Sequence, residues 1–410
     1  MRWLRRDFLK TVWAALPAGT YLSTYETLVA QEKGKVRIKD VKAIGLRGTG
    51  NCLVKVETDA GITGYGEAGS TGAMARARIA TFKQFLMGQD PLAIERHFSK
   101  LTSQAHTYVA HIPTISGVDI ALWDIAGKIL GRPVSTLMGG PFRNQIRLYI
   151  NTSPRDMLDA ASCREWAQRM NADPQGWSTF KIAFMQLLKT PVAQLSPTLV
   201  RSDLSRLERA FANVREAIGP EKDIVVHCHN EFNLPSAIGI AQAVEPTKPA
   251  WLEDAMPVAY TDSWATLRRQ TRVPILTGEK LELPRQFQPF LQNQAVDIVQ
   301  PDLAFCGGIT GARKIADLAA LYNVPVNTHN VGTVVLTMAS VHFGAAVQNF
   351  NTSENLTGQS RTILVERLAG GKAPAVRNSF IDVPETPGLG FEIDNDVLRS
   401  AMAPGEPWWN

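Results

Sequence analysis

Cysteine is scarce in this chain, and the few cysteines show no CxxC spacing. There are four among 410 residues: Cys52, Cys163, Cys228 and Cys306. Because they are scattered singly, they do not require a disulfide framework, and they do not exclude an oxidising compartment. Basic runs with interleaved aromatic residues are absent as well, so no nucleic-acid partner is expected.

Charge is also sparse. Only 20% of the residues are charged and 45% are apolar, which is typical of a soluble globular protein and not of a disordered or membrane chain. Much of the net charge of +5 comes from Arg2, Arg5, Arg6 and Lys10 at the start of the chain. A length of 410 residues allows a large core plus a second, smaller domain.

Residues 1–30 have the layout of an export signal. A positive segment is followed by a mildly apolar one and by the letters LVA before a polar stretch. Arg5-Arg6, followed by the letters DFLK, resembles the twin-arginine motif. The apolar part falls short of the roughly 20 residues that cross a bilayer, so no membrane anchor is expected. We expect a bacterial signal peptide that directs the folded chain to the periplasm; the alternative is an amphipathic tail with a chance arginine pair.

The next segment changes from one hydrophobic period to another. Residues from about 35 to 72 alternate polar and apolar positions between Gly-rich turns, as in NCLVKVETDAG, which predicts antiparallel strands. From about 73 to 140 apolar residues recur every three or four positions, as in ISGVDIALWDIAGKIL, which predicts helices. This order indicates an α+β domain over residues 35–140, to which the Pro- and Gly-rich stretch 375–410 is expected to return.

From residue 146 to 374, strand-like and helix-like segments alternate. Eight strands with seven intervening helices predict a closed (β/α)8 barrel, an α/β fold of the TIM-barrel type. Seven short apolar runs each lead to a charged or imidazole side chain: Lys181, His227, Glu253, Glu279, Asp302, His329 and Glu354. Because parallel barrel strands point their C-terminal ends at one face, we expect these side chains to converge in one metal and acid–base site.

The order of motifs resembles the enolase superfamily, nearest to its mandelate racemase and muconate lactonizing enzyme branch and to dehydratases of galactonate or mannonate type. GITGYGEA and SGVDIALWDIAGKILGRPVSTLMGG are similar to the strand and helix of that family's capping domain. WLED, TGE, PDLAFCGGITG and the pair Thr328-His329 fall at the family's barrel positions. The resemblance implies abstraction of a proton next to a carboxylate, giving an enediolate that a divalent metal, usually Mg²⁺, stabilises.

The metal site that the resemblance implies contains one departure. Glu253 and Glu279 match the family's second and third ligands, whose carboxylates suit Mg²⁺. His227 stands where the family has an aspartate; as a ligand it would shift the preference toward Mn²⁺ or another softer metal. The alternative is a hydrogen-bonded histidine that lines the barrel. Regular alternation would send Glu231 to the same face, where it would compensate near the metal or bind substrate.

Three residues are expected to carry acid–base chemistry. Asp302 and His329 resemble the family's dyad, in which His329 removes the α-proton and Asp302 fixes its tautomer. His229 resembles the general acid that protonates a departing hydroxide in the dehydratases, with a structural histidine as the alternative.

Two further catalytic residues, Lys181 and Glu354, are expected to bind the substrate carboxylate; Lys181 would alternatively stabilise the enediolate. Lys181 matches the first lysine of the family's KxK pair, but Ala183 replaces the second, which argues against two-base racemisation. Glu354 resembles an acidic hydrogen-bond donor, a role that requires it to be protonated. Lys280 follows Glu279 directly and is expected to point the other way along a regular strand, as a structural residue.

These roles predict a metal-dependent dehydratase of an acid sugar that forms a 2-keto-3-deoxy acid, assembled as a homo-oligomer as is common in the family. An epimerase, racemase or cycloisomerase would use the same proton abstraction. A non-catalytic periplasmic protein that binds sugar acids is the alternative from another class, with its metal site lost at His227.

Overall fold

The computed structural model describes residue 29 and residues 31–103, 110–189, 198–356 and 358–409. The leader expected over residues 1–30 lies outside the described residues except for Val29. Among the described residues, no helix combines the length and the hydropathy that spanning a membrane requires.

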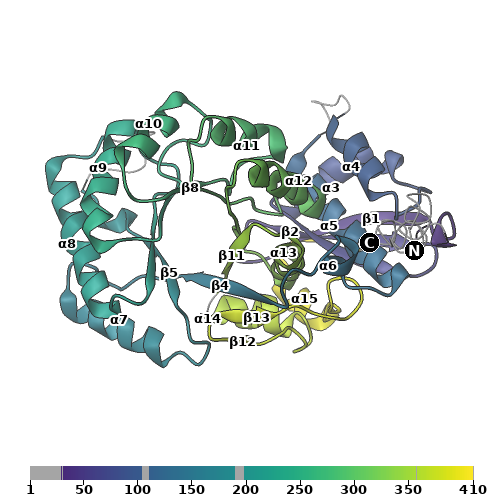
Figure 1. The fold of residues 1–410 in the computed structure, drawn as a ribbon. Coiled ribbons are helices and arrows are strands. Elements are labelled where there is room, and N and C mark those ends of the chain that lie inside the picture. The colour runs from purple at the N-terminus through teal and green to yellow at the C-terminus, as the bar shows by residue number, and fades with distance from the viewer. Residues whose placement is uncertain (1–28, 30, 104–109, 190–197, 357, 410) are drawn as a thin grey trace, which may run out of the picture.

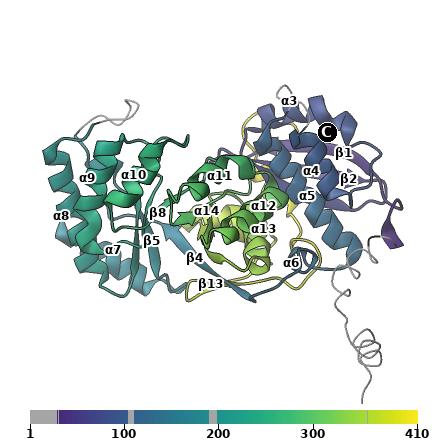
Figure 2. The same ribbon diagram turned by 45° about the horizontal axis from the view of Figure 1, so that its top comes forward.

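The N-terminal domain is a small sheet covered by helices. Its antiparallel strands lie in the order β1 (Ile38–Gly45), β2 (Cys52–Thr58) and β3 (Thr63–Ala68). The helices that follow are α3 (Gly72–Phe82), the 3₁₀ turn η1 (Lys83–Phe85), α4 (Ile94–Ser103), α5 (Ile112–Leu130) and α6 (Val134–Leu137). In Figure 2, α3, α4 and α5 lie together with β1 and β2, beside the barrel.

Helix α5 packs very closely on β3 because glycines face each other at the contact. A Cβ on Gly66 would lie 1.7 Å from the carbonyl oxygen of Gly117, and a Cβ on Gly64 would lie 2.2 Å from that of Ala121. The helix ends at Gly131, whose left-handed φ of 63° suits glycine. The Gly-rich GITGYGEA motif is therefore required by the packing of the helix on the sheet.

Eight parallel strands form the closed barrel that the sequence predicted. They are β4 (Gln145–Asn151), β5 (Thr179–Ala183), β6 (Asp223–His227), β7 (Trp251–Glu253), β8 (Ile275–Thr277), β9 (Ile298–Val299), β10 (Val326–Thr328) and β11 (Phe350–Asn355). The ring closes between β11 and β4, where Ser353 pairs with Leu148. Figure 1 shows the ring of strands with helices around it. Strands covered on all sides are apolar in sequence, which explains the short apolar runs.

Helices connect successive barrel strands. They are α7 (Ala160–Ala172), α8 (Arg201–Ile218), α9 (Leu234–Val244), α10 (Asp262–Gln270), α11 (Leu283–Gln292), α12 (Gly308–Leu321) and α13 (Val334–Ala346). Shorter elements are η3 (Met185–Leu187), η4 (Glu245–Thr247), α14 (Gly358–Arg361) and the π-helix η5 (Thr362–Arg367). In Figure 1, α12 and α13 lie between the barrel and the N-terminal domain.

The C-terminal stretch contacts both domains. Strands β12 (Val376–Arg377) and β13 (Phe380–Asp382) form a hairpin that pairs antiparallel with barrel strand β4. The chain then reaches the N-terminal domain, where Leu389 N donates to Asp124 of α5. After α15 (Asn395–Ala401), Glu406 pairs with Arg76 of α3.

A buried glutamate joins the N-terminal sheet to the barrel. Glu67, on β3, accepts hydrogen bonds from the backbone N–H and the hydroxyl of Thr333, at 2.9 and 2.6 Å, and from Leu336 N at 3.2 Å. Asn51 Nδ2 donates to its second oxygen at 2.9 Å. Because Thr333 caps α13, the carboxylate lies at the N-terminus of that helix, where negative charge is favourable.

Candidate active site

The C-terminal ends of the barrel strands bring the predicted side chains together. Lys181 lies on β5 and Glu354 on β11, while His227 and Glu253 are the last residues of β6 and β7. The other three side chains follow strand ends closely: Glu279 after β8, Asp302 after β9 and His329 after β10. The contacts below connect all seven residues into one cluster.

Lys181 is at the centre of the carboxylates. Its Nζ lies 2.5 Å from Glu253 Oε1, 3.1 Å from Glu354 Oε2 and 3.8 Å from Glu279 Oε2, and its side chain is only 1% exposed. Burial alone would lower the pKa of Lys181, but the three carboxylates outweigh it and hold that pKa above its usual value. The lysine is therefore a fixed positive charge inside the site.

Asp302 and His329 form the dyad that the sequence predicted. Asp302 Oδ2 lies 2.6 Å from His329 Nδ1, and Asp302 Oδ1 accepts a hydrogen bond from Ala304 N. The other ring nitrogen, Nε2, lies 3.3 Å from Glu279 and 3.7 Å from Glu354. Asp302 thus fixes the tautomer of His329, and the Nε2 atom of the ring faces the cluster.

The carboxylates around His329 also control its charge. Burial would lower the pKa of His329, but Glu279, Glu354 and Asp302 raise it to about 10. A positive charge bound among these carboxylates would oppose that increase and favour the neutral imidazole that a general base needs.

Four residues could hold a metal ion: His227, Glu253, Asp254 and Glu279. Each offers one ligand atom within 4.8 Å of the others. Among the residues that the structure describes, His227 Nε2, Asp254 Oδ2 and Glu279 Oε2 are buried without a hydrogen-bond partner. Buried polar atoms without partners are costly, and a divalent cation would satisfy them together. The donor set of three carboxylates and one imidazole therefore fits a divalent metal.

His227 and Glu279, two members of this set, differ in charge. Burial lowers the pKa of His227 well below its usual value, helped by Lys181, so the ring is neutral, as a ligand must be. Burial would raise the pKa of Glu279, but the positive charges of His329 and Lys181 outweigh it and keep that pKa below its usual value. Glu279 is therefore an anionic member of the set.

His229 and Glu231 lie beside the cluster. Strand β6 ends at His227, so the alternation that grouped Glu231 with the ligands does not continue. The His229 ring stands edge-on to that of His227 at 5.4 Å, and its side chain is 54% exposed. Glu231 Oε1 lies 3.4 Å from His229 Nδ1. Glu231 is thus a partner of His229, outside the candidate metal set.

Sequence reasoning missed Asp254. It follows Glu253 directly, so strand alternation predicts that it points away, but its positive φ of 52° turns the chain at that point. Thr277 donates to Asp254 Oδ1 at 2.6 Å, while burial raises the pKa of Asp254 well above its usual value. Asp254 is the last letter of the WLED motif, but no periodicity in a sequence indicates that an aspartate adopts a left-handed backbone conformation.

Sequence reasoning also missed the aromatic floor of the site. Tyr149 and Trp251 pack edge to face inside the barrel, with ring centroids 5.6 Å apart. Trp251 Nε1 donates to Glu253 Oε2 at 3.1 Å, and the Tyr149 hydroxyl donates to Glu354 Oε2 at 3.4 Å. These donors orient the carboxylates of Glu253 and Glu354 from the barrel interior.

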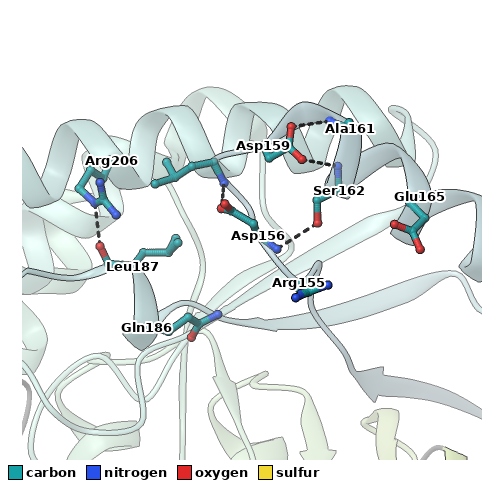
Figure 3. Close-up of a pocket in the computed structure, with 10 residues that line it drawn as sticks. Arg155, Asp156, Asp159, Ala161, Ser162, Glu165, Gln186, Leu187 and Arg206 are labelled. Carbon is teal, nitrogen blue, oxygen red and sulfur yellow. Dashed lines mark hydrogen bonds between the residues drawn. The ribbon is translucent and has the colours of Figure 1, made fainter.

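A cavity of about 690 Å³ lies away from this cluster, between the loop after β4 and η3 (Figure 3). Arg155, Gln186 and Arg206 line it, and Asp156 N donates to Ser162 Oγ along one wall. None of the predicted site residues belongs to its lining, so it is separate from the convergent cluster.

Taken together, the fold and the cluster define a class: a (β/α)8-barrel enzyme with a capping domain, an acidic candidate metal site and a histidine–aspartate dyad at the mouth. Comparison with known proteins agrees with this class. Residues 162–397 match the family model "Enolase C-terminal domain-like", and residues 27–139 match "Mandelate racemase / muconate lactonizing enzyme, N-terminal domain". The chain belongs to the enolase superfamily, in the mandelate racemase and muconate lactonizing enzyme family.

Relatives of known activity handle acid sugars or their lactones. The chain is 33% identical over 360 residues to D-xylonate dehydratase of Haloferax volcanii, covering 86% of each chain. It is 32% identical to D-galactarolactone cycloisomerase of Agrobacterium fabrum, over 86% of this chain and 91% of that one. A crystal structure of a mandelate racemase/muconate lactonizing enzyme-like protein from Rubrobacter xylanophilus superimposes with a TM-score of 0.81 at 31% identity, covering 91% and 99% of the chains.

Proposed function

We propose that the protein is a dehydratase that removes water from an acid sugar and yields a 2-keto-3-deoxy acid. The arrangement of two imidazoles carries this proposal. His229 follows β6 and His329 follows β10, and these strands are four places apart in a ring of eight, on opposite sides of the mouth. Elimination of water needs a base for the α-proton and an acid for the departing hydroxyl, and the two positions supply them.

The two histidines suit different roles. His329, buried and held by Asp302, would accept the proton from the carbon next to the carboxylate at Nε2. His229, half-exposed at the mouth, would donate a proton to the hydroxyl that leaves from the next carbon. The bond to the α-proton and the bond to the hydroxyl break, a carbon–carbon double bond forms, and the resulting enol becomes the 2-keto acid.

The substrate carboxylate would lie against Lys181 and Glu354. Lys181 supplies a buried positive charge, and Glu354 Oε1 has no hydrogen-bond partner among the described residues. A divalent cation held by Glu253 and Glu279, with His227 and Asp254 beside them, would add positive charge against the negative charge that develops on the substrate. The dehydratase relative named above supports the substrate class.

The proposal is tested by assaying 2-keto acid formation across a library of acid sugars with added Mg²⁺ or Mn²⁺. We expect wild type to dehydrate at least one acid sugar. His329→Asn should abolish both product formation and exchange of the α-proton with D₂O. His229→Asn should keep the exchange and lose product. If His329→Asn and His229→Asn had the same effect on product formation and on α-proton exchange, the two histidines would not have the separate roles proposed.

The cycloisomerase relative supports a second candidate within the same chemistry. A cycloisomerase or epimerase would exchange the α-proton and convert substrate without forming a 2-keto acid. Ala183, on β5 in place of the second lysine, leaves that position without a base for two-base racemisation. Tight binding of an acid sugar without exchange or product, under either metal, would instead favour a binding protein.

We also propose export. If residues 1–30 are a twin-arginine signal, replacing Arg5 and Arg6 by lysine should keep the chain in the cytoplasm of a bacterial host, while wild type is recovered from the periplasm. Equal recovery of both from the periplasm would contradict the proposal. Assembly into a homo-oligomer stays a prediction that light scattering of the purified chain would test.

A further inference from the structure

Two successive residues beside the candidate site adopt a backbone conformation that side chains disfavour. Immediately after β6, His229 has φ 55° and Asn230 has φ 64°. Asparagine and histidine enter the left-handed region more often than most side chains do, but two such residues in a row need support from their surroundings. The direction of the His229 ring depends on this turn.

Lys280 supplies much of that support. Its Nζ donates to the carbonyl oxygen of His229 at 3.2 Å and to Asn230 Oδ1 at 2.9 Å. Asn230 is also tied to the loop after β7, since its N–H donates to Asp254 O at 2.5 Å and its Nδ2 donates to Met256 O at 2.8 Å. The turn is thus held by loops from two neighbouring strands.

This position of Lys280 differs from the sequence prediction. Strand β8 ends at Thr277, so Glu279 and Lys280 lie in a turn and alternation does not separate their side chains. Lys280 Nζ lies 3.5 Å from Glu279 Oε1, and its side chain is 38% exposed. One side chain therefore links the turn that carries His229 to the loop that carries a candidate metal ligand.

We propose that Lys280 is a positioning residue that holds the strained His229–Asn230 turn and so aims His229 at the leaving hydroxyl. This inference rests on the proposed function, in which His229 is the general acid. His329 and Asp302 stand on the opposite side of the ring, after β10 and β9, and do not depend on this turn. Loss of Lys280 should therefore impair elimination and spare abstraction of the proton.

The first experiment compares the effect of Lys280→Met on elimination with its effect on proton abstraction. On an acid sugar that wild type dehydrates, we expect 2-keto acid formation to fall by about tenfold or more, because a general acid contributes roughly 10²–10⁴ and a displaced one loses part of that. Exchange of the α-proton in D₂O should fall far less than product formation, since Lys280 reaches His329 only through Glu279, whose Oε2 lies 3.3 Å from His329 Nε2. A general loss of structure would reduce both rates equally and would overturn the proposal.

Two variants serve as controls. Lys280→Arg keeps the charge and several donors, so it should recover part of the lost elimination. Lys222→Met removes another lysine-to-carbonyl bond, to Trp177 O at 2.8 Å, just before β6 at the other end of the barrel. It should leave the ratio of elimination to exchange as in wild type.

The second experiment reads the turn without any substrate. Hydrogen exchange by mass spectrometry on the full chain should show faster exchange of peptides that contain residues 228–231 in Lys280→Met, and not in Lys222→Met. Unchanged hydrogen exchange of these peptides in Lys280→Met would overturn the role of Lys280 in supporting the turn. Faster hydrogen exchange with an unchanged ratio of elimination to α-proton exchange would overturn the link between the turn and His229. If wild type dehydrates no acid sugar, the proposed function fails, while this measurement still decides whether Lys280 holds the turn.

Discussion

Replacing Glu67 by glutamine should destabilise the protein strongly although the change is isosteric. Both carboxylate oxygens of Glu67 accept hydrogen bonds, and all the donors around them are N–H or O–H groups of Thr333, Leu336 and Asn51. Glutamine turns one of these oxygens into an NH₂ group, which faces donors and cannot pair with them. Burial raises the pKa of Glu67, and the same donors oppose that increase, which indicates that they suit the carboxylate.

The magnitude follows from the groups left unpaired. At least one buried donor and the new NH₂ lose their partners, and each such group costs about 1–3 kcal/mol, so we expect a loss of about 2–6 kcal/mol. Urea unfolding followed by tryptophan fluorescence measures it. Glu57→Gln on β2 is the control, because its ion pairs with Lys42 and Lys55 are partly exposed and contribute about 1 kcal/mol or less. A loss below about 1 kcal/mol for Glu67→Gln would refute the reasoning.

Three further predictions follow from single residues. Gly66→Ala should cost about 3 kcal/mol in urea unfolding, because its Cβ would meet Gly117 O at 1.7 Å, while Gly50→Ala, in open space, should cost far less. Burial lowers the pKa of His342 to about 4, against roughly 6.5 in the unfolded chain. The contribution of the neutral ring to the free energy of unfolding should therefore be fully present above pH 6.5 and fall by up to about 3 kcal/mol as the pH drops toward 4. His342→Asn should remove this pH dependence. His227→Asp should bind Mg²⁺ roughly tenfold more tightly in calorimetry, because it adds a hard anionic ligand; unchanged affinity would exclude His227 from the site.

The fold was predictable because its signals are regular. The barrel strands are covered on every side, so their sequences are apolar runs, and the long helix α5 shows the three-to-four-residue period of a packed helix. The C-terminal stretch was harder to assign. Residues 380–382 pair with barrel strand β4 before the chain reaches α5, and no local pattern distinguishes a strand that pairs with one domain from a strand that pairs with the other.

The candidate site was predictable where a residue sits at a strand end. Lys181, Glu253 and His329 converge because parallel strands point one way, so their order in the sequence was sufficient. Contacts that depend on tertiary geometry were not predictable. Glu67 reaches the barrel across the domain boundary, and the hydroxyl of Tyr149 reaches Glu354 through the barrel interior.

The failures of sequence reasoning lie where regular strands stop. Asp254, His229 and Asn230 all have positive φ; Asp254 follows β7 directly, and His229 and Asn230 lie two and three residues after the end of β6. Alternation assigned Lys280 to the wrong side because it assumes an extended backbone, whereas β8 ends at Thr277. Strained conformations persist only when neighbours hold them, and they gather at functional sites. The backbone irregularity at these two strand ends is therefore an independent reason to place the chemistry there.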